Sequence, residues 1–315
     1  MGSPTPIRVT HCPVNFAGIG WTNVQALRRK GIDARLVVFN THRAHPEADV
    51  DLHLPDGPFL RRQAGQFAAL ARLLPQTDIF HFYFGLTLVP KRLQFPILTA
   101  TRKKSVFHFV GSDIRGKTPD ELAYGREADA QIVGSYDASR WVPEADVVPP
   151  GIDLSAIEPV PPREVGPMRV AHAALSRGRK GTEIIVAACD EVGVELDVIE
   201  NVRNNEVGPR LAEADIVVDQ LNSGWYGLFA IEAMAFGKPV LGYIHDEAAA
   251  RTAEAFGVEL PIVRTTKDSL AADLRRLVGS SDERRERGAA ARAYAERVHD
   301  ADVMAARLID IYSRL

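Results

Sequence analysis

The sequence predicts an α/β protein made of two Rossmann-like domains in tandem. Residues 214–242 run from a short apolar stretch, through a loop carrying Gly224 and Gly227, into a segment with helical spacing and then a second apolar stretch. Residues 7–39 repeat this order, and a proline-rich run at 149–167 separates the two halves. A strand, a glycine-bearing loop, a helix and a second strand form one parallel crossover unit, so each half predicts an open parallel sheet.

Length and composition set broad limits. The chain has 315 residues, which suits two domains, and 46% of them are hydrophobic, as in an ordinary globular protein. The net charge of −3 gives no global case for nucleic acid binding. Residues 1–150 hold 18 Lys and Arg against 14 Asp and Glu, so the first half is mildly basic, which fits a phosphate-bearing or acidic partner.

Cysteine usage and the ends of the chain bear on location. Cys12 and Cys189 stand far apart, no Cys/His cluster suggests zinc, and residues 1–9 lack a signal-peptide pattern. No stretch approaches about 18 consecutive apolar residues, the length that a membrane span needs. We therefore expect a cytoplasmic protein with no bound metal.

The first half predicts strands at 7–9, 35–39, 78–82, 106–110, 131–133 and 147–148, and helices at 22–30, 59–74 and 119–126. The loop Gly18-Ile19-Gly20 follows the first strand, as a dinucleotide-binding loop would. The fingerprint fails, however, because Asn23 stands where a third glycine belongs and the second strand ends at Asn40 instead of an acid. This half therefore gives little support for NAD or FAD binding.

Two polar patterns in the first half each allow two interpretations. Asp49-Val50-Asp51 matches a DxD metal motif, but so short a pattern favours a turn that enters a short strand. The segment 86–104 mixes helix and loop and carries a basic cluster. That cluster is either a solvated face or a site for a phosphate-bearing acceptor or an anionic membrane surface. Its members are Lys91, Arg92, Arg102, Lys103 and Lys104.

The proline-rich run places the domain boundary. We expect an N-terminal domain over 1–155, a linker over 156–167, a C-terminal domain over 168–297 and a last segment, 298–315, that packs back on the first domain. The second half predicts strands at 168–173, 195–199, 216–218 and 240–241. Helices are expected at 181–191, 205–213, 227–236, 246–256, 268–278, 282–298 and 300–315.

A basic loop in the second half has the chemistry of a diphosphate site. Arg177, Arg179 and Lys180 follow the strand 168–173 and come just before the helix that begins at Gly181. Arginine offers a two-pronged donor, lysine a point charge, and a helix N-terminus its free N–H groups. Taken alone, the loop also reads as an exposed basic turn. The helix expected from Gly227 offers a second set of free N–H groups, and Glu232 lies one turn inside it.

Three segments together resemble the retaining glycosyltransferases of family 4 (glycosyl transferases group 1), which have the GT-B fold. They are PPGIDL at 149–154, HAALSRGRKGTE at 172–183 and ADIVVDQLNSGWYGLFAIEAMAFGKPV at 214–240. GSDIRG at 111–116 and FAGIG at 16–20 agree more loosely. The resemblance implies two Rossmann-like domains that face each other across a cleft, with the C-terminal helix returning to the first domain.

The resemblance also implies roles for individual residues. Arg177 and Lys180 would bind the diphosphate of a nucleotide-sugar and stabilise the departing nucleotide without a metal. Glu232 matches the second acid of the family's E-x(7)-E motif and would hold the ribose hydroxyls. The implied lining of the donor site comprises Ser176, Tyr226, Gly227, Leu228, Gly18, Ile19 and Gly20. Asp113 would lie near the acceptor or the transferred sugar, on the catalytic side together with His108.

Two positions depart from the family pattern. Gly224 stands where the first acid of E-x(7)-E belongs, so the handling of the sugar is in question. Val110 stands where a histidine often precedes GSD; His108, two residues earlier on the same side of the strand, either replaces it or is a core histidine whose hydrogen bonds are satisfied. His81 allows the same two readings.

These observations favour a metal-independent, retaining, hexosyl-type glycosyltransferase. It would transfer a sugar from a UDP- or GDP-sugar to an acceptor that is a small molecule, a glycan or a lipid-linked group, with peripheral membrane contact through the N-terminal domain. A nucleotide-sugar epimerase or a phosphorylase on the same architecture is an alternative, because fold does not fix function. A third reading, motivated by Gly224 and Val110, is a degenerate donor-binding protein without transferase activity.

Overall fold

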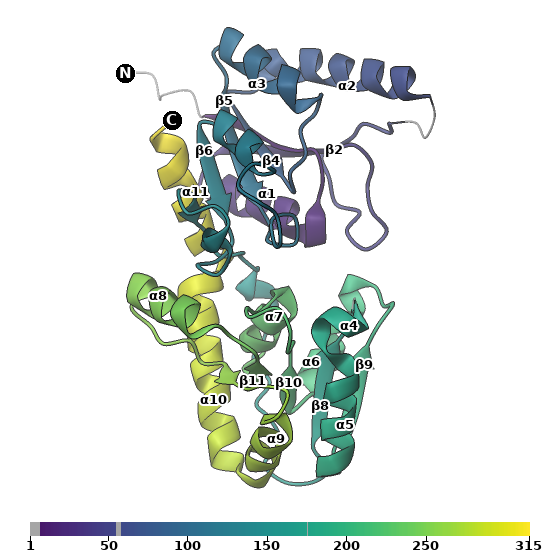
Figure 1. Cartoon of the computed structure of the whole chain (residues 1–315), viewed down its shortest axis with the longest axis vertical. Coiled ribbons are helices and arrows are strands. Elements are labelled where there is room, and N and C mark those ends of the chain that lie inside the picture. Colours follow the sequence, from purple (N-terminus) through teal and green to yellow (C-terminus); the bar gives the residue numbers. More distant parts are fainter. Residues whose placement is uncertain (1–6, 55–57, 175) are drawn as a thin grey trace. The chain divides into compact units, whose positions relative to one another are not determined.

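The structure is a computed structural model that describes residues 7–54, 58–174 and 176–315. The described chain divides into two compact units. The first, here the N-terminal unit, holds the residues up to Gly151 together with Ala301–Leu315; the second, the C-terminal unit, holds Ile152–Asp300. Each unit is a parallel sheet with helices packed against it (Figure 1).

The N-terminal unit is built on a parallel sheet in which seven strands are described, in the order β3-β2-β1-β4-β5-β6-β7. The strands are β1 (Arg8–Cys12), β2 (Asp33–Val38), β3 (Val50–Asp51), β4 (Ile79–Tyr83), β5 (Lys104–Phe109), β6 (Ala130–Val133) and β7 (Asp146–Val147). The helices are α1 (Ile19–Arg29), α2 (Phe59–Leu73), α3 (Lys91–Ala100) and α11 (Ala301–Ser313).

Helices cover both faces of this sheet. Alternate strand residues divide between two cores, because successive side chains in a strand point to opposite faces. Leu36 and Val38 of β2 pack with α1 and α11, whereas Val37 packs with α2 and α3. The C-terminal helix α11 therefore belongs to the N-terminal unit, as the sequence predicts, although α10 before it belongs to the other unit (Figure 1).

The C-terminal unit has a parallel sheet in which five strands are described, in the order β12-β11-β10-β8-β9. The strands are β8 (Arg169–Ala173), β9 (Glu195–Ile199), β10 (Ile216–Val218), β11 (Val240–Gly242) and β12 (Val263–Arg264). The helices are α4 (Arg177–Lys180), α5 (Thr182–Val192), α6 (Asn204–Glu213), α7 (Leu228–Ala235), α8 (Asp246–Phe256), α9 (Leu270–Gly279) and α10 (Ser281–Tyr294).

The α/β fold class is confirmed, and three local predictions are wrong. Residues 119–126 do not form an α-helix, because their backbone closes tighter i→i+3 bonds that end in a 3₁₀ turn at Ala123–Glu127. The basic segment before Gly181 is the short helix α4 instead of a loop. The helix expected over 282–298 changes after Tyr294 into a π-helical turn at Ala295–His299. The strand β12 was not predicted.

The region expected to act as a linker, residues 156–167, packs against the C-terminal unit. Val160 donates its backbone N–H to the Phe236 carbonyl at 3.0 Å. The Arg163 guanidinium forms an ion pair with Asp215 at 2.5 Å, and the buried Arg284 donates to the carbonyls of Arg163 and Glu164. These contacts tie the proline-rich run to β10 and α10.

Candidate functional site

The C-terminal sheet reverses its strand order between β8 and β10. The chain goes from β8 outward to β9, then returns to the other side of β8 and continues through β10, β11 and β12. In open parallel sheets, ligands bind at such a switch point, beside the carboxyl ends of the strands. The two loops that meet there carry Arg177–Lys180 and Gln220–Gly227, the segments in which the sequence predicts a donor site.

Asp219 joins these two loops. Its side chain is only 1% exposed, and Oδ1 accepts a hydrogen bond from Lys180 Nζ at 2.6 Å. The second oxygen, Oδ2, accepts the backbone N–H of Gly227 at 2.8 Å. A Cβ atom on Gly227 would lie 3.7 Å from Lys180 Nζ, so the ammonium group stands beside the N-terminus of α7. The Gly227 N–H is therefore occupied, and the prediction that it is free is wrong.

Gln220 organises the same loops through its side-chain amide. Nε2 donates to the carbonyls of Trp225 at 2.6 Å and Tyr243 at 3.1 Å, while Oε1 accepts the backbone N–H groups of Asn222 and Ser223. Asn222 in turn donates its side-chain amide to the carbonyl of Gly178 in α4. Hydrogen bonds thus join the loops that follow β8, β10 and β11 along one edge of the sheet. No signal in the sequence marks Gln220 or Asp219 as residues of the site.

Arg177 lies on the exposed side of this edge. Its guanidinium pairs with Glu183 at 2.8 Å and with Glu200. The hydrogen bond that Arg177 donates to the Glu183 carboxylate is the main reason that the pKa of Arg177 is raised above its ordinary value. Ser176, which precedes α4, is exposed and accepts the backbone N–H of Lys180 through its carbonyl. Arg177 and Lys180 therefore come from one turn of helix but have different carboxylate partners.

Glu232 of α7 is a half-buried acid. Its carboxylate has no hydrogen-bond or ion-pair partner among the residues that the structure describes. Burial raises the pKa of Glu232 to about 7. A carboxylate in this position can accept hydrogen bonds from a ligand, as the predicted contact with ribose hydroxyls requires.

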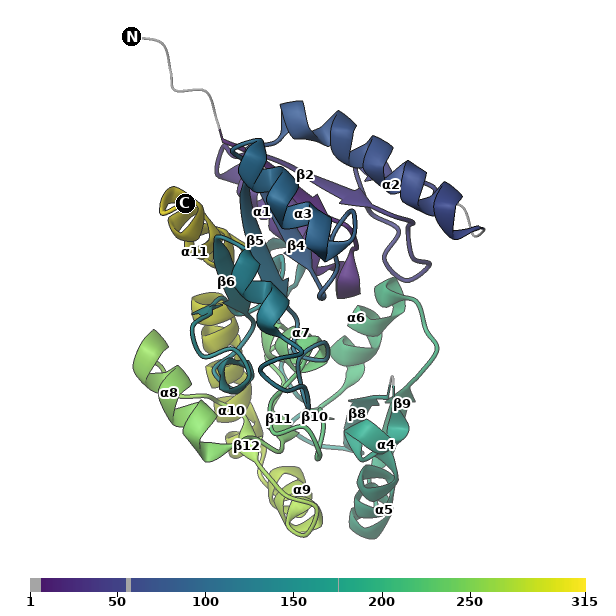
Figure 2. The ribbon, with the colours of Figure 1, turned by 45° about the horizontal axis from the view of Figure 1, so that its top comes forward.

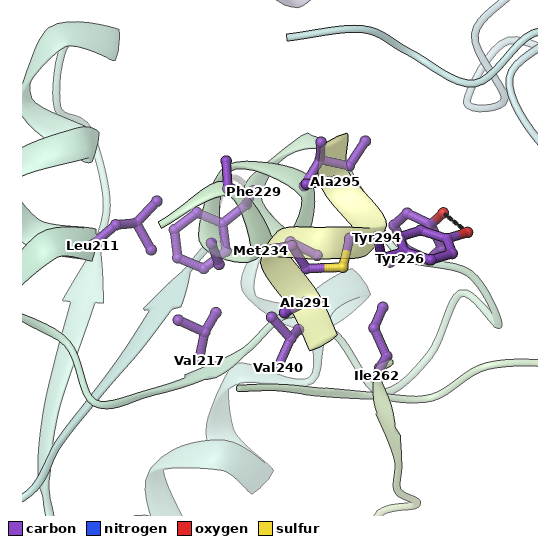
Figure 3. Packing of buried hydrophobic residues seen from close by; sticks show 14 of the residues in the cluster. Leu211, Val217, Tyr226, Phe229, Met234, Val240, Ile262, Ala291, Tyr294 and Ala295 are labelled. Atoms are coloured by element: carbon purple, nitrogen blue, oxygen red, sulfur yellow. Dashed lines mark hydrogen bonds between the residues drawn. The ribbon is translucent and has the colours of Figure 1, made fainter. Parts of the chain in front are cut away.

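The side chain of Tyr226 belongs to the core of the C-terminal unit. Its hydroxyl contacts Tyr294 Oη at 3.1 Å and His299 Nε2 at 3.0 Å, among apolar residues such as Met234 (Figure 3). Burial raises the pKa of this phenol well above its ordinary value. Only the backbone of Tyr226 is left to line a donor site. Leu228, the first residue of α7, is half-buried.

Gly224 has a backbone that excludes a side chain. Its φ of +71° is in the left-handed region, and a Cβ there would lie 2.1 Å from His245 Cε1. The backbone N–H of His245 also donates to the Gly224 carbonyl at 2.9 Å. The His245 imidazole therefore occupies the space into which an acid at position 224 would extend. No pattern in the sequence links the two residues.

The N-terminal sheet has its own switch point, between β1 and β4. The Gly18-Ile19-Gly20 loop follows β1 there, with Gly18 at a φ of +76° before the first turn of α1. Gly20 is packed closely, since a Cβ would lie 3.0 Å from Leu36 Cδ1. Phe16 of this loop stacks on Phe84, which follows β4, at 4.4 Å between ring centroids. The predicted glycine loop thus lies at the ligand-binding edge of its sheet.

Asp113 follows β5 at the same edge. It is 6% exposed; Oδ1 accepts the Val110 backbone N–H at 2.9 Å, and Oδ2 has no partner among the described residues. Burial raises the pKa of this carboxyl group. The assignment of Asp113 to the acceptor or the sugar stays a prediction.

His108 is buried in a network of rings. Its Nδ1 lies 3.1 Å from His81 Nε2, and His81 Nδ1 lies 2.7 Å from the hydroxyl of Tyr312 in α11. His11 stacks on His81 at 4.4 Å and contacts Tyr83 Oη at 2.6 Å. Burial lowers the pKa of His108 to about 3, so the ring is neutral. Both His108 and His81 have the contacts of satisfied core histidines, and a catalytic role for His108 stays a prediction.

The two acids of the DxD pattern lie at β3, Asp49 just before the strand and Asp51 within it. Asp49 accepts the Leu36 N–H and pairs with Arg28, and Asp51 accepts the N–H groups of Thr41 and His53, so both DxD acids make contacts within the fold. The described residues contain no group of three or more His, Cys, Asp or Glu suited to a metal ion. In the same residues, none of the helices has both the length and the apolar character of a membrane span.

Comparisons with known proteins give a fold. No family model and no curated protein matches the chain. Among solved structures, it is similar to the sucrose-phosphate synthase of Thermosynechococcus elongatus, with a TM-score of 0.70 and 14% identity over 98% of this chain and 99% of that one. HepE of Anabaena, solved with UDP and glucose, gives a TM-score of 0.69 and 13% identity over 99% and 100%.

A lipopolysaccharide outer core galactosyltransferase, WaaB, gives a TM-score of 0.62 and 12% identity over 99% of this chain and 100% of that one. These structural neighbours are GT-B glycosyltransferases. At such identities the likeness is one of fold, and the chain has the GT-B fold that its sequence predicts.

Proposed function

We propose that this protein is a retaining glycosyltransferase of family 4 that transfers a hexose-type sugar from a UDP- or GDP-sugar without a metal ion. The observation that carries the proposal is the junction of Lys180, Asp219 and Gly227 at the switch point of the C-terminal sheet. One neighbour with the same fold supports the substrate class, because the HepE structures contain UDP and glucose or UDP-glucose.

Lys180 is suited to a diphosphate. An ammonium group has three N–H donors, and Asp219 takes one of them, so two are left for phosphate oxygens. Breaking a sugar–phosphate bond builds negative charge on the leaving diphosphate, and a fixed cation aimed there lowers the barrier. Asp219 fixes the cation by holding it against the fold. Arg177, whose partners are the exposed Glu183 and the half-buried Glu200, supplies a second cation when the diphosphate displaces them.

Glu232 is proposed to hold the ribose. Its half-buried carboxylate has no partner among the described residues, and two adjacent hydroxyls would satisfy it. The backbones of Ser176, Tyr226 and Leu228 complete the donor side. In the N-terminal unit, Gly18–Gly20 and Asp113 are proposed to face the sugar and the acceptor, because they lie at the carboxyl edge of that sheet.

The Gly224–His245 contact favours a second candidate function. Since His245 fills the space of the family's first acid, the protein could bind a nucleotide-sugar without transferring the sugar. An epimerase on the same fold is the other alternative. Incubation with the donor alone separates the three functions. Epimerised donor indicates an epimerase, an intact donor that is bound indicates a binding protein, and slow hydrolysis indicates a transferase.

The direct test is turnover of UDP-glucose and GDP-glucose against a panel of sugar, phenol and lipid-linked acceptors, with EDTA present. We expect release of the nucleoside diphosphate and a glycosylated product. Lys180→Ala should lower the rate about 100-fold or more, as for loss of a group that stabilises a leaving group. Arg275→Ala, which removes an exposed partner of Glu191 elsewhere in the unit, is the matched control. An intact donor in every mixture, or equal rates for the two variants, would contradict the proposal.

A further inference from the structure

The helix α2 has two apolar faces. Gln66, Ala69, Leu70 and Leu73 are buried, and the two leucines belong to the core that packs against the sheet. A second set recurs at i, i+4, i+7 and i+11, the spacing of one helix face, and all its members are exposed. The members of this set are Leu60, Ala64, Phe67 and Ala71, here called the outer face of α2.

The outer face exposes unusually large side chains. Leu60 is 79% exposed and Phe67 37%, and Phe59 at the start of the helix is 71% exposed. Single exposed apolar residues are common, but an aligned set on one helix is a recognised mark of an interaction surface. Figures 1 and 2 both show α2 on the outside of the N-terminal unit with α3 near it. Leu93 of α3 is a further exposed apolar residue, at 41%.

The charge around this face has one sign. Residues 58–112 contain eight Lys and Arg, at positions 61, 62, 72, 91, 92, 102, 103 and 104, and a single acid, Asp78. Lys103 and Lys104 pair with Asp78 and Asp129, and Lys91 lies over the Tyr124 ring at 3.3 Å. The remaining side chains have no ion-pair partner among the described residues. They are Arg61, Arg62, Arg72, Arg92 and Arg102.

Arginines beside an exposed apolar stripe fit one kind of partner. Arg61 and Arg72 lie next to the outer face on the helix, about 100° around it from Leu60 and Ala71. An amphipathic helix that lies flat in a lipid interface has Phe and Leu on one side and Lys or Arg beside them, with attraction to anionic lipids. A protein partner would need its own acidic groups around an apolar groove, whereas an anionic membrane offers negative charge above an apolar layer over its whole surface.

We propose that the outer face of α2 docks on an anionic membrane surface. Leu60 and Phe67 enter the boundary between headgroups and acyl chains, and Arg61, Arg72 and Arg92 contact the lipid phosphates. The surface belongs to α2 and α3 alone and does not depend on the donor site. The expected membrane contact of the N-terminal domain is thereby assigned to α2, whose sequence alone predicts an ordinary amphipathic helix.

The test is co-sedimentation of the full chain with vesicles of phosphatidylglycerol and phosphatidylcholine, and with vesicles of phosphatidylcholine alone. We expect binding to the anionic vesicles that weakens as salt is raised. Leu60→Asp should reduce the partition coefficient about 10-fold or more. Arg61→Gln with Arg72→Gln should reduce binding to the anionic vesicles only.

Val165→Asp is the matched control, because Val165 is 83% exposed in the C-terminal unit and lies outside the proposed surface. It should bind as the parent does. All four substituted positions are exposed, so the variants should unfold at the same temperature as the parent. Failure of the parent to bind anionic vesicles, equal losses in Leu60→Asp and Val165→Asp, or a parent dimer that Leu60→Asp converts to a monomer in light scattering would each overturn the proposal.

Discussion

Lys180 and Asp219 are 39 residues apart in the chain, and Lys180 Nζ lies 2.6 Å from Asp219 Oδ1 across the switch point of the C-terminal sheet. The acid is 1% exposed and also accepts the Gly227 N–H, so one carboxylate fixes a cation and the entrance to α7 together. Asp219 is thus the centre of the candidate site, although it touches the proposed donor only through Lys180.

Replacing Asp219 tests this arrangement through stability. Asp219→Ala leaves the Lys180 ammonium and the Gly227 N–H without their acceptor, and losing the partner of a buried polar group costs about 1–3 kcal/mol. We expect a loss of that size in the free energy of unfolding, measured in urea. Glu191→Ala, which removes an exposed partner of Arg275, should change it by less than about 0.5 kcal/mol. Equal losses in the two variants would show that Asp219 has no structural role.

Gly224 should not tolerate a side chain. Gly224→Ala places a residue at a φ of +71°, which costs about 1–2 kcal/mol, and sets its Cβ against the His245 ring. Gly279→Ala, with open space around the Cβ, is the control and should be nearly neutral. The double variant Gly224→Ala, His245→Ala should recover the part of the loss that is due to the clash. No recovery would mean that the backbone angle alone sets the cost.

The histidine network predicts acid sensitivity. Burial lowers the pKa of His11 and of His108 to about 3, against 6.5 in the unfolded chain. The unfolded state then binds more protons between these values, so stability falls as the pH drops from about 6.5 towards 3. As the pH falls from 7.5 to 5, His11 and His108 should each lower the free energy of unfolding by up to about 2 kcal/mol.

The measurement is the urea midpoint and slope at pH 7.5, 6 and 5. His108→Gln should show a smaller decline with acid than the parent, whatever its stability at pH 7.5. His53→Gln, whose side chain is 84% exposed, should follow the parent. A decline that is unchanged in His108→Gln would contradict the buried neutral state of this ring.

Glu232 predicts the opposite pH dependence. The pKa of Glu232 is about 7 in the folded state and 4.5 in the unfolded state. The stabilising contribution of this group to the free energy of unfolding is therefore complete below pH 4.5 and is lost as the pH rises through 7. Because the side chain is half-buried, we expect a loss of about 1–2 kcal/mol between pH 5 and 8. Glu232→Gln should not show this loss of stability, whereas Glu247→Gln, exposed on α8, should behave as the parent does. Parallel curves for parent and Glu232→Gln would refute the shift.

Local sequence signals predicted most of the fold. The helix Asp246–Phe256 was predicted to the residue, because acids open it and Gly257 ends it in the left-handed region. The prediction over 119–126 failed because a helical composition does not reveal that the backbone closes i→i+3 bonds. Arg177–Lys180 reads as a loop because four residues are too few to show a helical period.

The candidate site was predicted only in part, for a physical reason. Arg177, Lys180 and Glu232 carry charges that suit a site for a diphosphate and a ribose, and the resemblance to the family motifs is what assigned these roles to them. Asp219, Gln220 and His245 act through contacts with residues from other loops. Such contacts depend on which strands are neighbours, and a single sequence does not state that.

The most direct test of the account is calorimetric titration of the full chain with UDP and with GDP in EDTA. We expect one of the two to bind at a single site, and Lys180→Met to weaken that binding about 10-fold to 100-fold, the effect of losing a charged hydrogen bond. Arg275→Ala should bind as the parent does. No binding of either nucleotide, or equal affinity in the parent and Lys180→Met, would contradict a diphosphate site at the Lys180–Asp219 junction.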